Sequence, residues 1–202
     1  MIKNIVFDIG KVLNSFDWNP YIKDLLGDAE AIAAVERAIW KSGLWLEKDR
    51  GVIDEHEMLD KMLELEPGYE QELRLAMDNI QGCLGRKPYA IPWIGELKEA
   101  GYNVYYLSNM SKHVIKAAWE AFDFVPHMDG GIFSCDVLLV KPEPEIYEAL
   151  TEKYDLEPAE CVFIDDHQEN VDAAAALGWH GLLFTSYIET HRKLAELLES
   201  TR

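Results

Sequence analysis

Charged and hydroxyl side chains follow short apolar runs at four places along the chain. Asp8 comes directly after the run that ends at Phe7, and Gly10 lies two residues further on. A carboxylate at the end of a buried strand is costly unless a cation or a reaction uses its charge, because burial strips it of water. Asp8 is therefore the first candidate for a catalytic group. Polar residues after the other runs are further candidates: Ser108, Asn109, Lys141, Asp165, Asp166 and Asn170.

Ser108 and Asn109 show what such positions can do. A hydroxyl and backbone N–H groups at the start of a helix can bind phosphate oxygens. The same residue types also cap helix N-termini. The residues alone leave both roles open.

Short strands alternating with helices are expected to position these groups. Short apolar runs predict the strands. Stretches with apolar residues at helical spacing, several of which end at a glycine, predict the helices. This order predicts an α/β fold with a doubly wound parallel sheet, whose ligands bind beyond the carboxyl ends of the strands. After the run that precedes Asp8, the predicted strands are 104–107, 131–133, 162–164 and 182–184, and the predicted helices are 89–100, 111–122, 143–153 and 168–177.

Residues 15 to 88 interrupt this alternation with helix signals alone. Helices are predicted at 29–40, 54–65 and 68–80, joined by turns that contain Gly and Pro. An insertion directly after the first strand should lie over the carboxyl edge of the sheet. We therefore expect an α/β core formed by residues 1–14 and 89–202, with a helical cap formed by residues 15–88.

Four sequence motifs resemble those of the haloacid dehalogenase-like hydrolase superfamily. They are VFDIGKVL, YLSN, VKPEPEIY and FIDDHQENVDAA, which appear in the family's order and each at the end of a predicted strand. One such motif would be weak evidence, whereas four in order are specific. The resemblance covers the whole chain and implies an α/β core with a helical cap and the phosphatase branch of the family.

The resemblance implies a metal-assisted phosphatase mechanism. Asp8 would attack phosphorus and form an aspartyl-phosphate that water then hydrolyses. Mg²⁺ would bind to Asp8, to the backbone carbonyl of Gly10 and to Asp166, in keeping with the preference of this cation for oxygen ligands. Asp165 and Asn170 would support the site from beside it. Asp166 also has the residue type of a helix N-cap, and the two roles are compatible.

The remaining two motifs would bind the substrate phosphate. The resemblance favours phosphate binding by Ser108 and Asn109 over helix capping. Lys141 would neutralise both the nucleophile and the phosphoryl oxygens, so it is predicted to be a catalytic and a phosphate-binding residue.

Gly10 departs from the family pattern, because most phosphatases of the family carry there an aspartate that protonates the leaving group. Losing such an acid typically costs a factor of roughly 10² to 10⁴ in rate. One interpretation is a good leaving group, as in a sugar 1-phosphate, since DIGKV is similar to a D-L-G-N-V motif of phosphatases for such substrates. In a second, His167, Asp17 or water transfers the proton. In a third, catalysis is impaired and the chain binds a phosphate-bearing ligand.

Two other reactions of the family fit the motifs less well. Metal-independent 2-haloacid dehalogenases also use an aspartate nucleophile without an acid at the second position. Their fourth motif has serine and asparagine in place of adjacent acids, so Asp165 and Asp166 favour the phosphatase, and the dehalogenase stays the alternative. Phosphomutases are disfavoured because they depend on the aspartate that Gly10 replaces.

The cap is expected to select the substrate. Asp17 and Trp18 are the preferred candidates for facing it, because they follow the first strand closely enough to overhang Asp8. Aromatic residues at helical spacing also pack in cores. The other candidates are Phe16, Trp40, Trp45 and Asp49.

Composition limits the partners of the chain. Its 202 residues, 49% of them hydrophobic, suffice for a packed core, and a formal charge of −18 disfavours nucleic acid and anionic membranes. A small phosphorylated metabolite is the expected partner, bound by a monomer or a homodimer. A strand begins almost at Met1 and no apolar run is long enough to span a bilayer, so a cytoplasmic location is expected. The three cysteines include no C-x-x-C pair and indicate reduced thiols.

Overall fold

A central parallel sheet brings the candidate strand ends together. In the computed structural model, which describes residues 1–201, five strands pair in the order β5-β4-β1-β6-β7. Every neighbouring pair in this sheet is parallel, so the carboxyl ends lie at one edge. The predicted doubly wound sheet is thereby confirmed. Its strands are β1 (Asn4–Phe7), β4 (Asn103–Ser108), β5 (Gly130–Phe133), β6 (Cys161–Asp165) and β7 (His180–Leu183).

The strand order reverses at β1. The chain runs outward from β1 through β4 to β5, then returns to the other side of β1 to form β6 and β7. Ligands of such sheets bind beyond the carboxyl ends, where the order reverses. Asp8 follows β1, Ser108 ends β4 and Asp165 ends β6, so three neighbouring strands bring these residues to that point.

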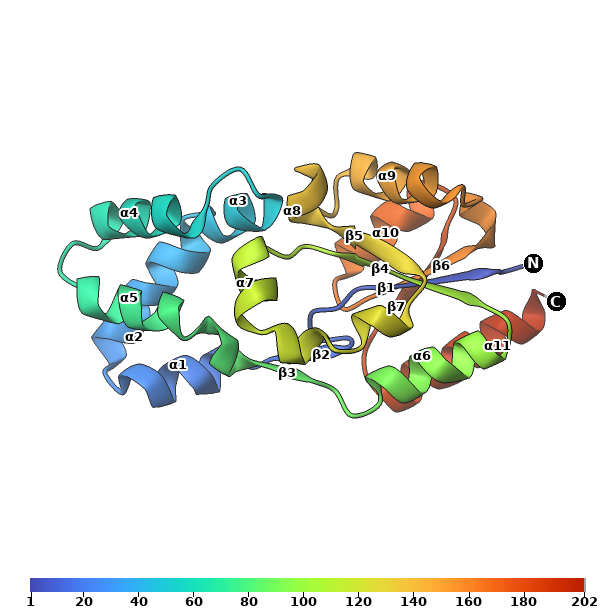
Figure 1. Ribbon diagram of the computed structural model, residues 1–202, viewed down its shortest axis with the longest axis horizontal. Coiled ribbons are helices and arrows are strands. Elements are labelled where there is room, and N and C mark those ends of the chain that lie inside the picture. The colour runs from blue at the N-terminus through green and yellow to red at the C-terminus, as the bar shows by residue number, and fades with distance from the viewer. Residues whose placement is uncertain (202) are drawn as a thin grey trace.

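Helices cover both faces of the sheet (Figure 1). Ile5 and Phe7 pack in the cluster that includes α6 and α11, whereas Val6 packs in the cluster that includes α9 and α10. Successive strand residues point to opposite faces, so burial on both faces produces a continuous apolar run. These helices and their neighbours are α6 (Ala90–Glu99), α7 (Lys112–Ala117), α8 (Ser134–Val137), α9 (Pro144–Tyr154), α10 (Gln168–Ala176) and α11 (Tyr187–Ser200).

A second group of helices lies beyond the carboxyl edge of the sheet, at the left of Figure 1. The predicted helices at 29–40, 54–65 and 68–80 correspond to α2, α4 and α5, and α2 continues into a π-helical turn at Arg37–Lys41. Helices α1 and α3 were not predicted. We call this group the cap and the remainder the core. The cap helices are α1 (Trp18–Leu26), α2 (Ala29–Glu36), α3 (Leu44–Arg50), α4 (Glu55–Leu65) and α5 (Glu70–Asp78).

A short antiparallel ribbon joins core and cap. Strand β2 (Asn14–Phe16) pairs with β3 (Leu84–Arg86). The segment 15–88 therefore does not consist of helices alone, as its pattern predicted, but begins and ends in strand. Three residues are too few to show a strand period of two, which explains the error. The division of the chain at residues 14 and 88 stays a prediction.

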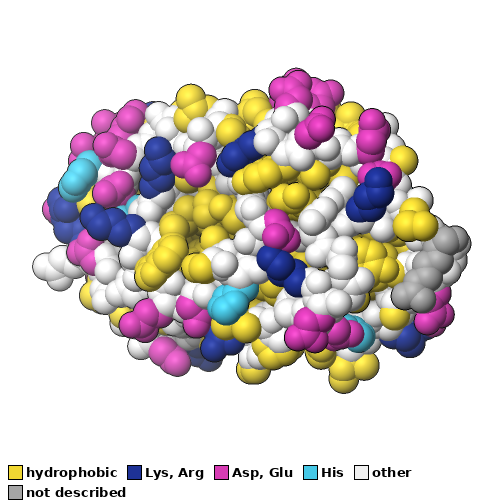
Figure 2. Space-filling view, turned by 45° about the vertical axis from the view of Figure 1, so that its right-hand side comes forward, with side chains coloured by type: hydrophobic (Ala, Val, Ile, Leu, Met, Phe, Trp, Pro, Cys, Tyr) yellow, Lys and Arg dark blue, Asp and Glu magenta, His cyan; other side chains and the backbone are white. Residues whose placement is uncertain are grey.

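The surface and the ends of the chain complete this description. Figure 2 shows hydrophobic side chains gathered near the middle of one face, with acidic and basic side chains around them. The N-terminus and the C-terminal end of α11 lie at the end of the core that faces away from the cap (Figure 1). No helix among the described residues is both long and apolar enough to cross a membrane. The three cysteines are buried and unpaired. The cytoplasmic location and the monomer or homodimer stay predictions.

Candidate active site

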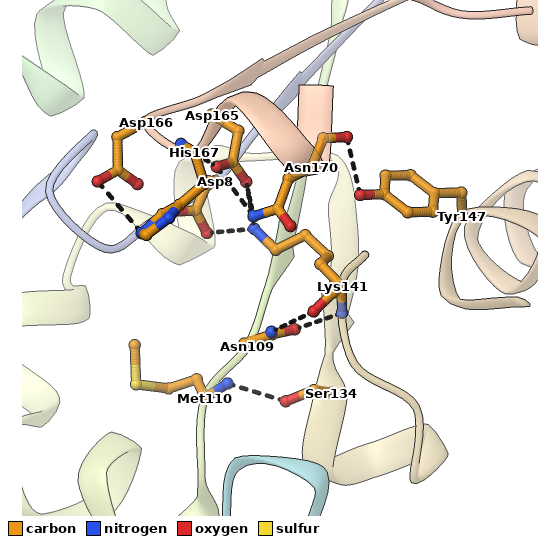
Figure 3. A network of polar contacts seen from close by, with 10 residues as sticks. All are labelled: Asp8, Asn109, Met110, Ser134, Lys141, Tyr147, Asp165, Asp166, His167 and Asn170. Atoms are coloured by element: carbon orange, nitrogen blue, oxygen red, sulfur yellow. Dashed lines mark hydrogen bonds and ion pairs between the residues drawn. The ribbon is translucent and has the colours of Figure 1, made fainter. Parts of the chain in front are cut away.

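Lys141 lies at the centre of a buried ionic network (Figure 3). Its Nζ is 2.7 Å from Asp8 Oδ1 and 2.6 Å from Asp165 Oδ2, and only 2% of its side chain is exposed. Burial alone would lower the pKa of Lys141, but the two carboxylates more than offset this, so its pKa is raised. The lysine therefore stays charged at neutral pH.

Asp165 lies behind the lysine and accepts hydrogen bonds with both carboxylate oxygens. Its Oδ1 accepts from the backbone N–H of His167 at 2.8 Å, and Asn170 Nδ2 lies 3.0 Å from each oxygen. The carbonyl of Asn170 in turn accepts from the Tyr147 hydroxyl at 2.9 Å. These contacts hold the Asp165 carboxylate in one orientation. Its predicted supporting role, shared with Asn170, therefore has a geometric basis.

Asp8 is fixed by the sheet and tuned by its neighbours. Its backbone N–H donates to the carbonyl of Ile164 at 2.8 Å, which continues the pairing of β1 with β6. Burial raises the pKa of Asp8, Lys141 lowers it, and Asp165 and Asp166 raise it again, giving about 6. At neutral pH the carboxylate form prevails, and that is the form a nucleophile requires.

An acidic cluster at this edge fits a hard divalent cation. Asp8, Asp165 and Asp166 offer carboxylate oxygens that lie within 4.8 Å of one another. Asp166 is partly exposed, with Lys11 Nζ at 3.7 Å and His167 Nε2 at 3.6 Å from its Oδ2. Carboxylate oxygens with this excess of negative charge are the donor set that Mg²⁺ prefers.

Asn109 holds the backbone of Lys141. Its Oδ1 accepts from the Lys141 N–H at 2.8 Å, and its Nδ2 donates to the Lys141 carbonyl at 3.0 Å. The amide side chain therefore positions the lysine, a role that the sequence did not reveal. A contact of Asn109 with phosphate would come from its backbone N–H, next to the buried Ser108.

A cavity of about 390 Å³ opens above these residues, between core and cap. Its core wall is polar and its cap wall is largely aromatic, with ring centroids of Trp40 and Trp45 4.6 Å apart and those of Phe16 and Trp40 6.0 Å apart. Core residues that line it include Asp8, Gly10, Ser108, Asn109, Lys141, Asp166, His167 and Asn170, and the residues opposite are Phe16, Trp40, Trp45, Leu46 and Asp49.

Asp17 and Trp18, the preferred candidates for facing the substrate, line a neighbouring hollow of about 420 Å³. Trp18 is buried and packs edge-on against Trp40, with ring centroids 5.3 Å apart. Strand β2 separates them from Asp8 along the chain, and neither residue lines the cavity that holds Asp8. Closeness in sequence therefore did not place these two residues in the cavity that holds Asp8.

Helix α3 is tied to the core by polar contacts that the sequence did not predict. The Ser134 hydroxyl donates to the carbonyl of Asp49 and accepts from the backbone N–H of Met110 at 2.9 Å. The guanidinium of Arg50 forms a two-fold ion pair with Glu143, at 2.7 and 2.5 Å. These contacts fix the cap wall relative to the strand ends.

Lys11 has an unusual backbone conformation, three residues after Asp8. Its φ of 57° lies in the left-handed region, which costs a residue with a Cβ about 1–2 kcal/mol. Gly10 has no such φ, and a Cβ added there would have Asp8 Oδ2 as its nearest neighbour, at 3.8 Å. The loop after β1 is therefore strained at residue 11 and open at residue 10.

The fold and the site define an α/β enzyme with carboxylates and a buried lysine at the carboxyl edge of a parallel sheet, beneath a helical cap. Residues 2–178 match the model of the haloacid dehalogenase-like hydrolase family. The chain belongs to this family and is a hydrolase, as its motifs predicted.

Relatives and solved structures agree with this assignment. The chain is 31% identical to a sesquiterpene phosphatase of Aspergillus oryzae, over 97% of this chain and 96% of that protein. It is 26% identical to a D-ribitol-5-phosphate phosphatase of Bacteroides thetaiotaomicron, over 99% of this chain and all of that protein. A family enzyme of Bacteroides thetaiotaomicron, solved with magnesium and inorganic phosphate, superposes with a TM-score of 0.75 at 26% identity, covering 93% of this chain and 96% of that one.

Proposed function

We propose that the protein is a Mg²⁺-dependent phosphatase that hydrolyses small phosphomonoesters through an aspartyl-phosphate. The observation that carries this proposal is the bridge formed by Lys141 between Asp8 and Asp165, with Asp166 beside it in the same cavity. A cationic amine beside a carboxylate nucleophile suits phosphoryl transfer, which depends on positioning and on neutralising charge. The names of the two phosphatase relatives support the same reaction class.

Each residue has a defined task in this proposal. Asp8 attacks phosphorus, and Lys141 neutralises the phosphoryl oxygens as their charge redistributes. Ser108 and the backbone N–H of Asn109 bind phosphate oxygens. Asp8, Asp166 and the carbonyl of Gly10 would hold the cation, which supplies further positive charge to the phosphate when bound.

The aromatic cap wall suggests where the organic part of the substrate lies. Phe16, Trp40 and Trp45 line the cavity opposite Asp8, so the group esterified to phosphate would lie against their rings. Such a wall suits an apolar group or the C–H face of a polyol. The dehalogenase alternative receives less support, because the acidic cluster of Asp165 and Asp166 has no task in a metal-independent reaction.

Phosphate release from a panel of phosphorylated metabolites and p-nitrophenyl phosphate tests the proposal. Wild type and Asp8→Asn are compared with Mg²⁺, with a chelator, and with Mg²⁺ restored. We expect turnover that falls to background in Asp8→Asn and under chelation and returns with Mg²⁺. Turnover unaffected by the chelator would rule out the metal-dependent mechanism. Release no faster than that of Asp8→Asn would instead favour a binding module.

A further inference from the structure

Asp49 is a buried carboxyl group on the otherwise apolar cap wall. It is 6% exposed, lines the same cavity as Asp8, and its Oδ1 is buried without a hydrogen-bond partner. An unpartnered ionised oxygen would be very costly there, which favours the protonated form. Burial accordingly raises the pKa of Asp49 to about 7, with a smaller contribution from the charge of Asp8.

We propose that Asp49 is the general acid and base of the reaction, in the place that Gly10 leaves without one. This inference rests on the proposed phosphatase function. A residue of the cap would then transfer the proton, because Gly10 in the core has no side chain that could do so. The alternatives from the sequence are less well placed, because Asp17 lines the neighbouring hollow and the His167 side chain is 57% exposed.

The backbone of Asp49 is held firmly enough to position a proton. Its own carbonyl accepts from Ser134, and the next residue, Arg50, is paired with Glu143. Gly51 then packs so closely on the core that an added Cβ would meet the backbone of Cys135 at 3.0 Å. Residues 49 to 51 therefore all contact the core, so the backbone that carries the Asp49 carboxyl group has little freedom to move away.

The neighbours of Asp49 act on its pKa in both directions, and burial outweighs those that lower it. Lys48 on the same helix, the Ser111 backbone at the start of α7 and the Trp45 side chain all lower its pKa, and Asp8 across the cavity raises it. An ionised Asp49 would repel both Asp8 and a phosphate dianion, whereas a neutral carboxylic acid would not. The binding of a phosphate dianion therefore favours the protonated form of Asp49.

The proposed steps balance without a further reactant. As Asp8 bonds to phosphorus, the bond from phosphorus to the leaving oxygen breaks, and that oxygen takes the proton of Asp49 and departs as an alcohol. In the second step Asp49, now a carboxylate, takes a proton from water as the water oxygen bonds to phosphorus. The bond between Asp8 and phosphorus breaks, phosphate leaves, and both carboxyl groups regain their starting forms.

The dependence of rate on leaving group tests this role. We compare Asp49→Asn with wild type on an alkyl phosphate, phenyl phosphate and p-nitrophenyl phosphate, and use Glu47→Gln, an exposed acid on the same helix, as the control. For Asp49→Asn we expect kcat/KM to fall about 10²- to 10⁴-fold on the alkyl phosphate and less than about tenfold on p-nitrophenyl phosphate. The basic limb of the pH profile should also disappear. Glu47→Gln should match wild type.

A second variant separates proton transfer from a structural role. Gly10→Asp in the Asp49→Asn background should restore hydrolysis of the alkyl phosphate, because a side chain at residue 10 starts 3.8 Å from Asp8 Oδ2. Equal losses on all three substrates with an unchanged pH profile, or no loss at all, would overturn the inference and leave the proposed function standing. An inactive wild type would overturn both.

Discussion

The two walls of the cavity are built on opposite principles. On the core wall, Asp165 accepts hydrogen bonds from both Lys141 and Asn170, and the charge of the lysine is matched by the carboxylates of Asp8 and Asp165. The cap wall combines aromatic rings with the buried carboxyl group of Asp49, whose Oδ1 has no hydrogen-bond partner.

This difference separates what is fixed before the substrate arrives from what awaits it. Fully satisfied polar networks in a low dielectric are rigid and keep their charges in place. A carboxyl group without a partner is in a costly state that a suitable ligand can relieve. Under the proposed function, the core wall is a preorganised site for phosphate, and the cap wall contacts the organic part and the leaving oxygen of the substrate.

Removing the charge of Lys141 from the core wall should have the largest effect on the free energy of unfolding. Lys141→Met leaves the buried carboxylates of Asp8 and Asp165 without their cation, which costs about 3–5 kcal/mol of unfolding free energy. Urea denaturation in Mg²⁺-free buffer measures this. Lys61→Met, which removes a half-exposed lysine paired with Glu57 on the cap, should change the value by less than about 1 kcal/mol. Equal changes in the two variants would contradict the comparison.

The free energy of unfolding, measured as a function of pH, should reveal the protonated Asp49 carboxyl group on the cap wall. The unfolded Asp49 carboxyl ionises near pH 4 and the folded one near pH 7. Between these values the folded state holds a proton that the unfolded state has lost, so the unfolding free energy falls as pH rises and levels off above about pH 7.

Asp49→Asn lacks this contribution, so its stability relative to wild type should increase from pH 5 to pH 8. The expected increase is about 2–3 kcal/mol, at roughly 1.4 kcal/mol per unit of pKa shift. Thermal or urea unfolding of both proteins across this range measures it. The other titrating groups are present in both proteins and cancel. Parallel curves would show that Asp49 carries no proton at neutral pH.

Removing one aromatic ring from the cap wall should weaken binding of the organic part of the substrate and leave phosphate binding unchanged. Trp40→Ala removes a ring that packs against both Phe16 and Trp45. We expect KM for a substrate with a bulky organic group to rise about five- to thirtyfold, the equivalent of roughly 1–2 kcal/mol. Inhibition by inorganic phosphate, which needs only the core wall, should be unchanged. Trp119→Ala, at a tryptophan that is 54% exposed, serves as the control. Weaker inhibition by phosphate would show that the two walls do not act separately.

The core wall could be predicted from the sequence to a large extent. Buried parallel strands give continuous apolar runs, and the residue after each run lies at the ligand-binding edge of the sheet. That rule led to Asp8, Ser108 and Asp166, which line one cavity together with Lys141. Lys141 itself follows an apolar run that is not a strand, because α8 and a loop separate it from the end of β5. It could not reveal that the Asn109 side chain holds Lys141, because those residues are 32 positions apart and their pairing arises only in the folded chain.

The cap wall could be predicted much less well. Helix α3 has seven residues, too few for a clear helical period, and its contacts with Ser134 and Glu143 span 85 and 93 positions. Asp49 was one of several candidates for facing the substrate, and nothing local distinguished it from Asp17. What distinguishes it is burial, which depends on how the cap docks on the core.

The left-handed backbone of Lys11 has a consequence for engineering this protein. Glycine or asparagine accepts that conformation more readily, so a redesign guided by thermal stability alone would replace the lysine. The replacement would also remove the ammonium group that lies 3.7 Å from Asp166. Heat resistance and local charge therefore make opposite demands on one position, and a stabilised version of the protein should draw its mutations from elsewhere in the chain.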